Sequence, residues 1–158
     1  MTGKPVMKIK PPGSSFDPDW SSLRSRLWPG SVGPGDRQEM TADLSRGHFV
    51  RLAYAPTGAA VGLVEASKRM DYVNGTSTSP VVFLEGLYVE PVARHNGVAR
   101  ALVAEVDQWA REQGCSELAS DAALWNAAAQ AVHRALGFEE TERVVYFRRT
   151  IRARDPQA

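Results

Sequence analysis

The sequence predicts an α/β protein of the α+β type, in which two helices precede the main run of strands. Three observations support this class. Apolar residues repeat with a helical period before about residue 47, and the period changes to that of strands over the next segments, His48–Ala55 and Ala60–Ala66. An apolar strand over Val81–Val89 is interrupted by Glu85-Gly86. The same strand leads directly into a glycine-containing loop and a long amphipathic segment.

The first segments each carry a recognisable start or end. Val6–Ile9 is predicted as a short strand that Pro11-Pro12-Gly13 ends. Asp17 is expected to cap a helix that has Pro18 in its first position and that ends at Pro29-Gly30. Its apolar stripe consists of Trp20, Leu23 and Leu27. A second helix is expected over Arg37–Ser45, with Asp36 as its cap and Gly47 after its end.

The middle of the chain has strand periodicity. His48–Ala55 and Ala60–Ala66 flank Pro56-Thr57-Gly58, which is typical of a hairpin turn. Lys68–Pro80 is polar and is expected to form a long loop before the strand Val81–Val89. Together these segments predict consecutive neighbouring strands.

The second half alternates helix and strand. An amphipathic helix is expected to begin at Val98 and to end near Gly114, because apolar residues recur there at helical spacing. A strand over Cys115–Ser120, a helix over Asn126–Leu136 and a final strand over Val144–Ile151 follow. The predicted order is therefore β, α, α, β, β, β, α, β, α, β.

The composition excludes several classes of protein. The 158 residues, 43% of them apolar, suffice for one globular domain, and a net charge of +1 gives no argument for nucleic-acid or membrane partners. Cys115, the single cysteine, fits a reducing compartment, so a cytoplasmic protein is expected. Residues 1–158 are read as one domain, with 1–6 a disordered or alternative start and 152–158 a polar tail.

The strand–loop–helix over residues 81–100 has the features of a site for a phosphorylated ligand. Gly86 within a strand favours a β-bulge, which frees main-chain donors and acceptors. Arg94-x-x-Gly97-x-Ala99 places small residues and cations where a helix begins, and the unpaired amides of a helix N-terminus attract phosphates. Coenzyme A offers both amides and a diphosphate. An ordinary strand–loop–helix without a ligand is the simpler alternative.

The chain resembles the GNAT superfamily of acetyltransferases, in which such a loop binds the diphosphate of acetyl-CoA. Four further segments narrow the resemblance to the bacterial aminoglycoside 6'-N-acetyltransferases. They are residues 23–30 (LRSRLWPG), 71–86 (DYVNGTSTSPVVFLEG), 119–123 (ASDAA) and 132–147 (VHRALGFEETERVVYF).

The resemblance implies a GNAT fold: a central mixed, mostly antiparallel sheet of about six to seven strands, splayed at strand 4, with about four helices around it. It also implies direct transfer of the acetyl group of acetyl-CoA, the only cofactor, to the 6'-amine of an aminoglycoside. Such transfer confers antibiotic resistance. The family often forms dimers, and the apolar last strand agrees with a homodimer.

The resemblance further implies the residues of the site. The drug-binding residues would be Trp28, Tyr72, Glu85, Asp121 and Glu142, whose carboxylates suit a polycation. Either Glu85 or Asp121 would accept the amine proton, and the sequence does not choose between them. The acetyl-CoA residues would be Leu87, Tyr88, Val89, Arg94, His95, Asn96, Gly97, Val98, Ala99, Arg100, Asn126 and His133.

One position departs from the wider superfamily. Many members have a tyrosine that protonates the leaving thiolate, and this chain has His133 there, between Asn126 and Gly137-Phe138. His133 could reach the sulfur or serve only in packing. The three histidines lack the spacing of metal ligands, so no metal is expected.

Each site residue also has a simpler explanation. Glu85 could face solvent beside a bulge, Asp121 could cap a turn, and Glu142 could belong to a solvated charge run. Trp28 and Tyr72 could be packing residues. A GNAT enzyme for another amine or a protein N-terminus, and a non-catalytic acyl-CoA-binding module, are the alternative functions.

Overall fold

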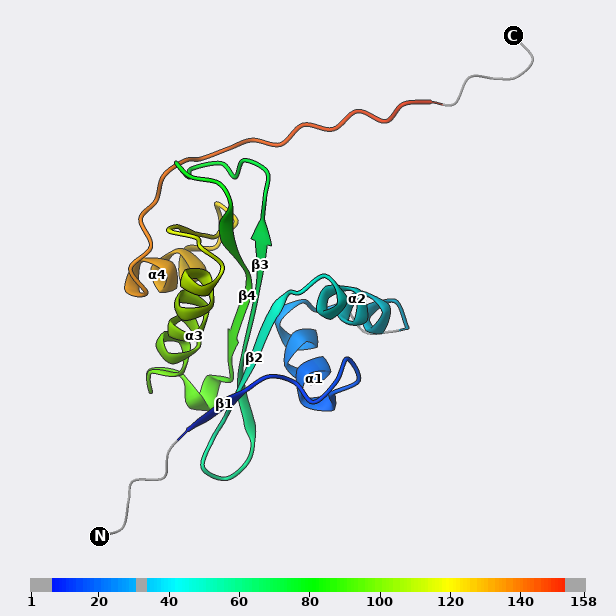
Figure 1. Ribbon diagram of the computed structural model, residues 1–158, viewed down its shortest axis with the longest axis vertical. Helices are drawn as coiled ribbons and strands as arrows, with labels where there is room; N and C mark the ends of the chain where they lie inside the picture. The colour runs from blue at the N-terminus through cyan, green and yellow to red at the C-terminus, as the bar shows by residue number, and fades with distance from the viewer. Residues whose placement is uncertain (1–6, 31–33, 153–158) are drawn as a thin grey trace, which may run out of the picture.

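A computed structural model of the chain describes residues 7–30 and 34–152. Its centre is a five-stranded sheet in the order β1-β2-β3-β4-β5 (Figure 1). The strands from β1 to β4 are antiparallel neighbours, and β5 is parallel to β4. They span Lys8–Lys10, Phe49–Tyr54, Ala60–Arg69, Val81–Val89 and Leu118–Ala119. The mixed, mostly antiparallel sheet implied by the resemblance is confirmed.

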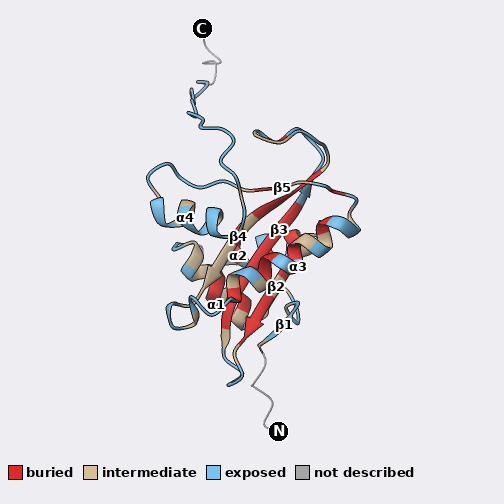
Figure 2. Ribbon diagram, turned by 90° about the vertical axis from the view of Figure 1, so that its left-hand side faces the viewer, coloured by how far each residue is buried: buried red, intermediate tan, exposed pale blue. Residues whose placement is uncertain are grey.

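Helices cover both faces of this sheet. α1 (Pro18–Leu27) and α2 (Pro34–Ser45) lie on one side, and α3 (Val98–Glu112) and α4 (Ala127–Ala135) lie on the other (Figure 1). A short 3-10 helix, Pro91–Ala93, joins β4 to the loop before α3. The long apolar strands β3 and β4 are therefore covered on both faces, and Figure 2 shows that burial is concentrated there.

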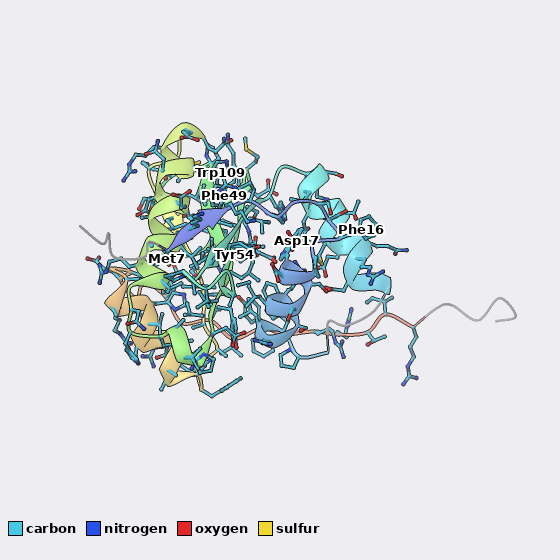
Figure 3. The ribbon with its side chains drawn as sticks, turned by 90° about the horizontal axis from the view of Figure 1, so that it is seen from below. Met7, Phe16, Asp17, Phe49, Tyr54 and Trp109 are labelled. Carbon is cyan, nitrogen blue, oxygen red and sulfur yellow. The ribbon has the colours of Figure 1, made fainter. Side chains whose placement is uncertain are left out.

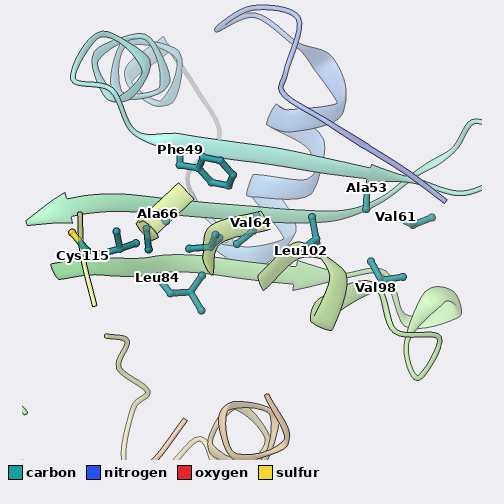
Figure 4. Close-up of a cluster of buried hydrophobic side chains, with 12 residues drawn as sticks. Phe49, Ala53, Val61, Val64, Ala66, Leu84, Val98, Leu102 and Cys115 are labelled. Carbon is teal, nitrogen blue, oxygen red and sulfur yellow. The ribbon is translucent and has the colours of Figure 1, made fainter. Parts of the chain in front are cut away.

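A core cluster fills each layer between helix and sheet. The cluster under α3 contains Leu102, Val106 and the buried Cys115, together with residues of β2, β3 and β4 (Figure 4). The cluster under α1 and α2 contains Trp20, Leu23 and Met40. The helical stripes predicted from the sequence are thus the buried faces, and each fully buried large apolar side chain contributes about 1.5–3 kcal/mol.

Local signals explain where the helices begin. The Asp17 carboxylate accepts from the amides of Asp19 and Trp20, as predicted, and Pro18 occupies the first turn. Figure 3 shows Asp17 at the start of α1.

The same view shows Phe49 beside Trp109 on the other side of the sheet, and the centres of these two stacked rings lie 5.1 Å apart. No helix within the described residues combines the length and apolarity needed to cross a bilayer.

A buried ionic network joins α1 and α2 to β3. Arg24, only 4% exposed, donates to Glu65 at 2.7 Å and to Asp36 at 3.1 Å. Trp20 Nε1 donates to the other Glu65 oxygen at 2.6 Å. Burial raises the pKa of Glu65, although Arg24 and Trp20 oppose this. Burial also opposes the charge of Arg24, but the carboxylates of Glu65, Glu39 and Asp36 outweigh it and raise the pKa of the guanidinium.

Several predicted boundaries are wrong. α2 begins at Pro34, so Asp36 lies inside its first turn and binds Arg24 in place of capping the helix. β3 continues three residues beyond Ala66, because its pairing with β4 extends to Arg69. β5 is limited to Leu118–Ala119. Residues 1–6 and 153–158, predicted as a loose start and a polar tail, lie outside the described residues, as does Val6 of the first strand.

The predicted final strand is also wrong. Residues 139–152, here called the C-terminal arm, contain no strand, and the arm leads away from the other elements (Figure 1). Its apolar residues are exposed: Val145 by 78%, Tyr146 by 83%, Phe147 by 94% and Ile151 by 75%. The sheet therefore has five strands in place of the expected six to seven. The apolar and aromatic run over residues 144–147 suits a strand, but the arm makes no ladder hydrogen bonds with the described residues.

Candidate active site

The predicted β-bulge is present in β4. Glu65 of β3 pairs with Gly86, and the next residue, Ala66, pairs with Leu84. Glu85 is therefore the extra residue of β4 and has no partner in the ladder. The bulge lets Glu85 and Gly86 lie on the face of α1, since Gly86 faces Leu27 and Trp28 and Glu85 contacts Ser67.

β4 and β5 separate after only two paired residues. The parallel ladder joins Val82 to Leu118 and Phe83 to Ala119, and it ends there. In the described chain, no strand pairs with the β5-side edge of β4 from Leu84 to Val89. Main-chain groups along this edge can therefore pair with an extended ligand, in the manner of an added strand. Leu87, Tyr88 and Val89 lie on this open stretch.

The loop after β4 has the geometry of an anion site. Gly97 caps α3 with φ at 80°, a left-handed conformation that favours glycine, and within the described residues no side-chain cap bonds the start of α3. A Cβ at Gly97 would meet nothing within 4 Å, so the backbone is open to a ligand. His95 also has a positive φ, 62°. Turns of this kind direct successive amides toward one point, where the helix dipole favours negative charge.

The other loop residues make local bonds. The Arg94 guanidinium donates to the Val89 carbonyl at 3.0 Å. Asn96 donates to the carbonyl of Arg94 at 3.1 Å. Arg100 donates to Ala135 at the end of α4 at 3.2 Å and so ties α3 to α4. The two arginines thus flank the loop, while the main-chain amides of Gly97, Val98 and Ala99 form its centre.

Glu85 has two partners that the sequence did not indicate. Ser67 Oγ donates to the Glu85 carboxylate at 2.5 Å, and Arg69 Nη2 donates to its two oxygens at 2.9 and 3.0 Å. The Arg69 guanidinium also lies 3.7 Å from the centre of the Phe83 ring. Strand alternation places Ser67 and Arg69 on one face, but the bulge shifts the register and hides their match to Glu85 in the sequence.

Trp28 packs directly beside the bulge. A Cβ at Gly86 would lie 2.7 Å from the Trp28 ring and 2.6 Å from Leu27, so only glycine permits this approach. On another side, the Arg24 guanidinium lies 4.9 Å from the centre of the Trp28 ring. Trp28 thus packs against Gly86, the neighbour of Glu85 in the bulge, and Arg24 links Trp28 to the buried ionic network.

The other predicted drug-binding residues line a neighbouring open cavity of about 1560 Å³. Tyr72, Asp121 and Glu142 all border it, and all three are exposed. Glu85 and Trp28 do not border it, whereas Arg69, the partner of Glu85, does. The structure therefore brings the predicted residues together in two adjoining groups joined through Arg69.

The loop that carries Tyr72 is held by Glu117. The Glu117 carboxylate accepts from the amides of Ser77 and Thr78 at 2.9 and 2.6 Å, and from the Thr78 hydroxyl. The Thr78 hydroxyl bond, followed by the two amide bonds, lowers the pKa of Glu117. Charged Glu117 therefore fixes this loop against the segment before β5. The sequence around Glu117 and the sequence around Ser77-Thr78 gave no indication of this contact.

α4 presents His133 to the cavity, and Asn126 lies just before the first residue of the helix. Asn126 caps the helix, since its side-chain oxygen accepts from the Ala129 amide at 3.0 Å. His133 Nε2 lies 2.9 Å from Ser120 Oγ, and Nδ1 lies 2.7 Å from the Ala129 carbonyl. Trp125, just before the helix, is 85% exposed. Within 7–30 and 34–152, no three histidine, cysteine or carboxylate side chains gather as a metal site would require.

Comparison with known sequences identifies the family. The profile of the Acetyltransferase (GNAT) family matches residues 18–138. The chain is 50% identical over 146 residues to an aminoglycoside N(6')-acetyltransferase type 1 of Acinetobacter genomosp. 13, covering 92% of this chain and 99% of the relative. A protein of that name from Stenotrophomonas maltophilia is 52% identical over 130 residues, covering 82% and 84%.

Solved structures agree with the sequence comparison. An aminoglycoside antibiotic 6'-N-acetyltransferase from Acinetobacter baumannii superposes with a TM-score of 0.88 at 48% identity, covering 92% of this chain and 99% of that chain. AAC(6')-Iy in complex with the bisubstrate analogue CoA-S-monomethyl-acetylneamine gives 0.86 at 43% identity with the same coverage. By sequence and by fold, the chain belongs to the GNAT family of acetyltransferases.

Proposed function

We propose that this chain transfers the acetyl group of acetyl-CoA directly to the 6'-amine of aminoglycosides. The observation that carries the proposal is the position of the bulge, where an open strand edge that suits coenzyme A meets a carboxylate and a cavity lined by two more. The names of the relatives at about 50% identity support the choice of acceptor. Acetylation removes the charge of the 6'-ammonium, so the reaction confers resistance.

Acetyl-CoA would lie along β4. Leu87, Tyr88 and Val89 would pair with the amides of the pantetheine arm, because this edge has no strand partner in the described chain. The diphosphate would bind the amides at the start of α3. The surrounding loop would supply Arg94, His95, Asn96, Gly97, Val98, Ala99 and Arg100. Asn126 and His133 would lie near the thiol.

The aminoglycoside would bind between Trp28 and Tyr72. Glu85, Asp121 and Glu142 would supply the negative charge that a polycation requires on a protein with a net charge of +1. Arg69 neutralises part of the charge of Glu85, so Asp121 and Glu142 would carry much of the attraction. Because Coulomb attraction between exposed charges is screened by salt, the drug affinity should fall as ionic strength rises.

The reaction needs positioning more than reactive groups. The neutral amine attacks the thioester carbon, and holding the two reactants in line supplies most of the acceleration. Main-chain amides freed at the bulge would stabilise the oxyanion. Glu85 or Asp121, directly or through water, would take the proton that the amine loses. We place the reaction in the cytoplasm, because acetyl-CoA is available there.

Thiol release tests the proposed acceptor class. The chain with acetyl-CoA and tobramycin should release CoA with a kcat/KM at least about a hundredfold above that for spermidine, since only tobramycin fills both groups of site residues. A higher kcat/KM for spermidine would favour a GNAT enzyme for other amines. Tight CoA binding without any transfer would favour a binding module.

Gly97→Val should weaken acetyl-CoA binding. Valine disfavours a φ of 80°, so the loop would rearrange and its amides would no longer converge. The expected result is a rise of about tenfold or more in the Kd of CoA, the equivalent of about 1.4 kcal/mol. Gly114→Val is the matched control, because Gly114 has a similar φ, 72°, at the far end of α3. Equal CoA affinity in both variants would contradict the assignment.

We also propose that the chain forms a homodimer through the C-terminal arm. The arm exposes Tyr146 and Phe147 almost fully. Its ion pairs within the described residues lie at its base, where Glu140 binds Arg134 of α4 and Arg143 of the arm. The free edge of β5 and the arm of a second copy could complete each other's sheets. Such an exchange would bury the apolar side chains of the arm.

Charges on the arm should break this dimer. The double substitution Tyr146→Asp and Phe147→Asp should convert the dimer to a monomer in analytical ultracentrifugation, because two carboxylates would enter an apolar interface. Phe16→Asp is the control, since Phe16 is 68% exposed near α1 and away from the arm. An unmodified chain that sediments as a monomer would overturn the proposal.

A further inference from the structure

Ser120 lies at the point where β4 and β5 separate. The ladder ends with the pair Phe83 and Ala119. Leu84 follows Phe83 in one segment, and Ser120 follows Ala119 in the other. The Ser120 hydroxyl lies 3.3 Å from the Leu84 carbonyl oxygen and so closes the apex of the opening. Ser120 belongs to no set of functional residues described above, although it borders the same cavity as Asp121.

The proposed acetyl-CoA site places the thioester near this apex. Strands rise about 3.3 Å per residue, so the four steps from Val89 back to Glu85 span about 13 Å. An extended pantetheine arm that starts at the α3 N-terminus and follows β4 would therefore bring its sulfur to the bulge. Leu84 and Ser120 lie immediately beyond that point.

The contacts of His133 define the proton on Nδ1, whereas Nε2 faces a hydroxyl that can donate or accept. The Ala129 carbonyl only accepts, so Nδ1 carries a proton and donates to it at 2.7 Å. In the neutral ring, Nε2 is then unprotonated and accepts from the Ser120 hydroxyl at 2.9 Å. In the charged ring, Nε2 donates to Ser120 Oγ, and the single hydroxyl proton is then directed to another acceptor, which in this structure is the Leu84 carbonyl. The pair can therefore pass a proton outward.

We propose that Ser120 and His133 form the relay that protonates the departing sulfur, a proposal that rests on the acetyl transfer described above. As the amine nitrogen bonds to the carbonyl carbon, the carbon–sulfur bond breaks and sulfur takes the Ser120 hydroxyl proton. Ser120 Oγ takes the Nε2 proton of charged His133. The proton lost by the amine leaves through a carboxylate or water, and solvent protonates His133 again. Ser120 is the catalytic residue, and His133 acts through it.

The relay predicts a specific pattern among variants. Ser120→Ala should lower the single-turnover rate of acetyl transfer, with both substrates saturating, by about 10²-fold, the usual contribution of a positioned acid. His133→Gln should lower it by a similar factor. The double variant should lose no more than either single variant, because one broken link stops the relay. Ser120→Thr keeps the hydroxyl and should recover most of the rate.

A purely structural role would give another pattern. If the pair only held α4 against the segment after β5, Ser120→Ala would raise the Kd of CoA and lower Tm while the saturated rate changed little. Ser45→Ala on α2, which removes a hydroxyl bonded to the Thr41 carbonyl, is the matched control and should keep the full rate.

Two results would overturn the relay. The first is Ser120→Ala with the rate of the unmodified chain, and the second is a double variant whose loss equals the product of the single losses. Failure of the proposed function would give a different result: the unmodified chain itself would transfer no acetyl group to tobramycin.

Discussion

Replacing Arg24 with methionine is expected to lower the free energy of unfolding by about 3–5 kcal/mol, the usual effect of removing one partner from a buried ionic pair. Arg24 is 4% exposed and lies within 4 Å of four carboxylates: Asp36, Glu39, Asp43 and Glu65. Without the guanidinium, the buried charge of Glu65 would keep only the Trp20 indole as a bonded partner among the residues that the structure describes.

The loss in Arg24→Met should grow with pH. Burial raises the pKa of Glu65 above 4.5, and Arg24 opposes that rise. A carboxyl whose folded pKa is raised stabilises the fold at low pH, and this contribution is lost as pH rises through the folded pKa. Removing Arg24 raises that pKa further. The destabilisation should therefore be smaller in acid and larger at neutral pH.

Urea unfolding at several pH values measures this effect. Arg37→Met is the matched control, because Arg37 is exposed on α2, and its change should stay within about 0.5 kcal/mol. A loss for Arg24→Met that is below about 1 kcal/mol, or that shrinks as pH rises, would contradict the account of the network. Because Arg24 also contacts Trp28, the folded fraction of the variant should bind the drug less tightly.

Glu85→Gln should have the second large effect, on catalysis. The substitution keeps the size of the side chain but removes its charge and its capacity as a base. We expect kcat/KM for tobramycin to fall about 10²-fold, as when a charged hydrogen bond and a positioned proton acceptor are both lost. The KM for acetyl-CoA should change by less than about threefold, since the proposed diphosphate site lies at the start of α3.

Arg69 provides the discriminating control. If Glu85 acts on the drug, Arg69→Gln should lower KM for tobramycin, because a cation next to the site disappears. If Glu85 serves only to hold Arg69, both substitutions should reduce activity alike. Glu105→Gln, on α3, removes a carboxylate that faces Arg51 and should leave kinetics unchanged.

Local signals in the sequence were sufficient to predict most of the helices and strands. The bounds of β4 were predicted as observed, because turn residues and Glu90-Pro91 limit an apolar run. The Asp17 cap and the stripe of α3 were also confirmed, since capping and helical period depend on near neighbours. A bulge at Glu85-Gly86 could be predicted from the sequence, because glycine inside an apolar strand often marks one.

The remaining features depend on contacts distant in sequence. Asp36 was expected to cap a helix, but its partner, Arg24, comes from another helix. Arg69 and Ser67 could not be matched to Glu85 without the register across the bulge. The arm has the pattern of a strand, and a strand pattern does not say which chain supplies its neighbour. His133 and Ser120 are 13 residues apart and meet only through the placement of α4 against the end of β5.

The most direct test of the proposed function compares neomycin with paromomycin as acceptors. The two drugs differ only in bearing an amine or a hydroxyl at the 6' position. CoA release and mass spectrometry of the products should show one acetyl group on neomycin and none on paromomycin at equal enzyme and acetyl-CoA. Equal acetylation of both drugs, or of neither, would contradict transfer to the 6'-amine.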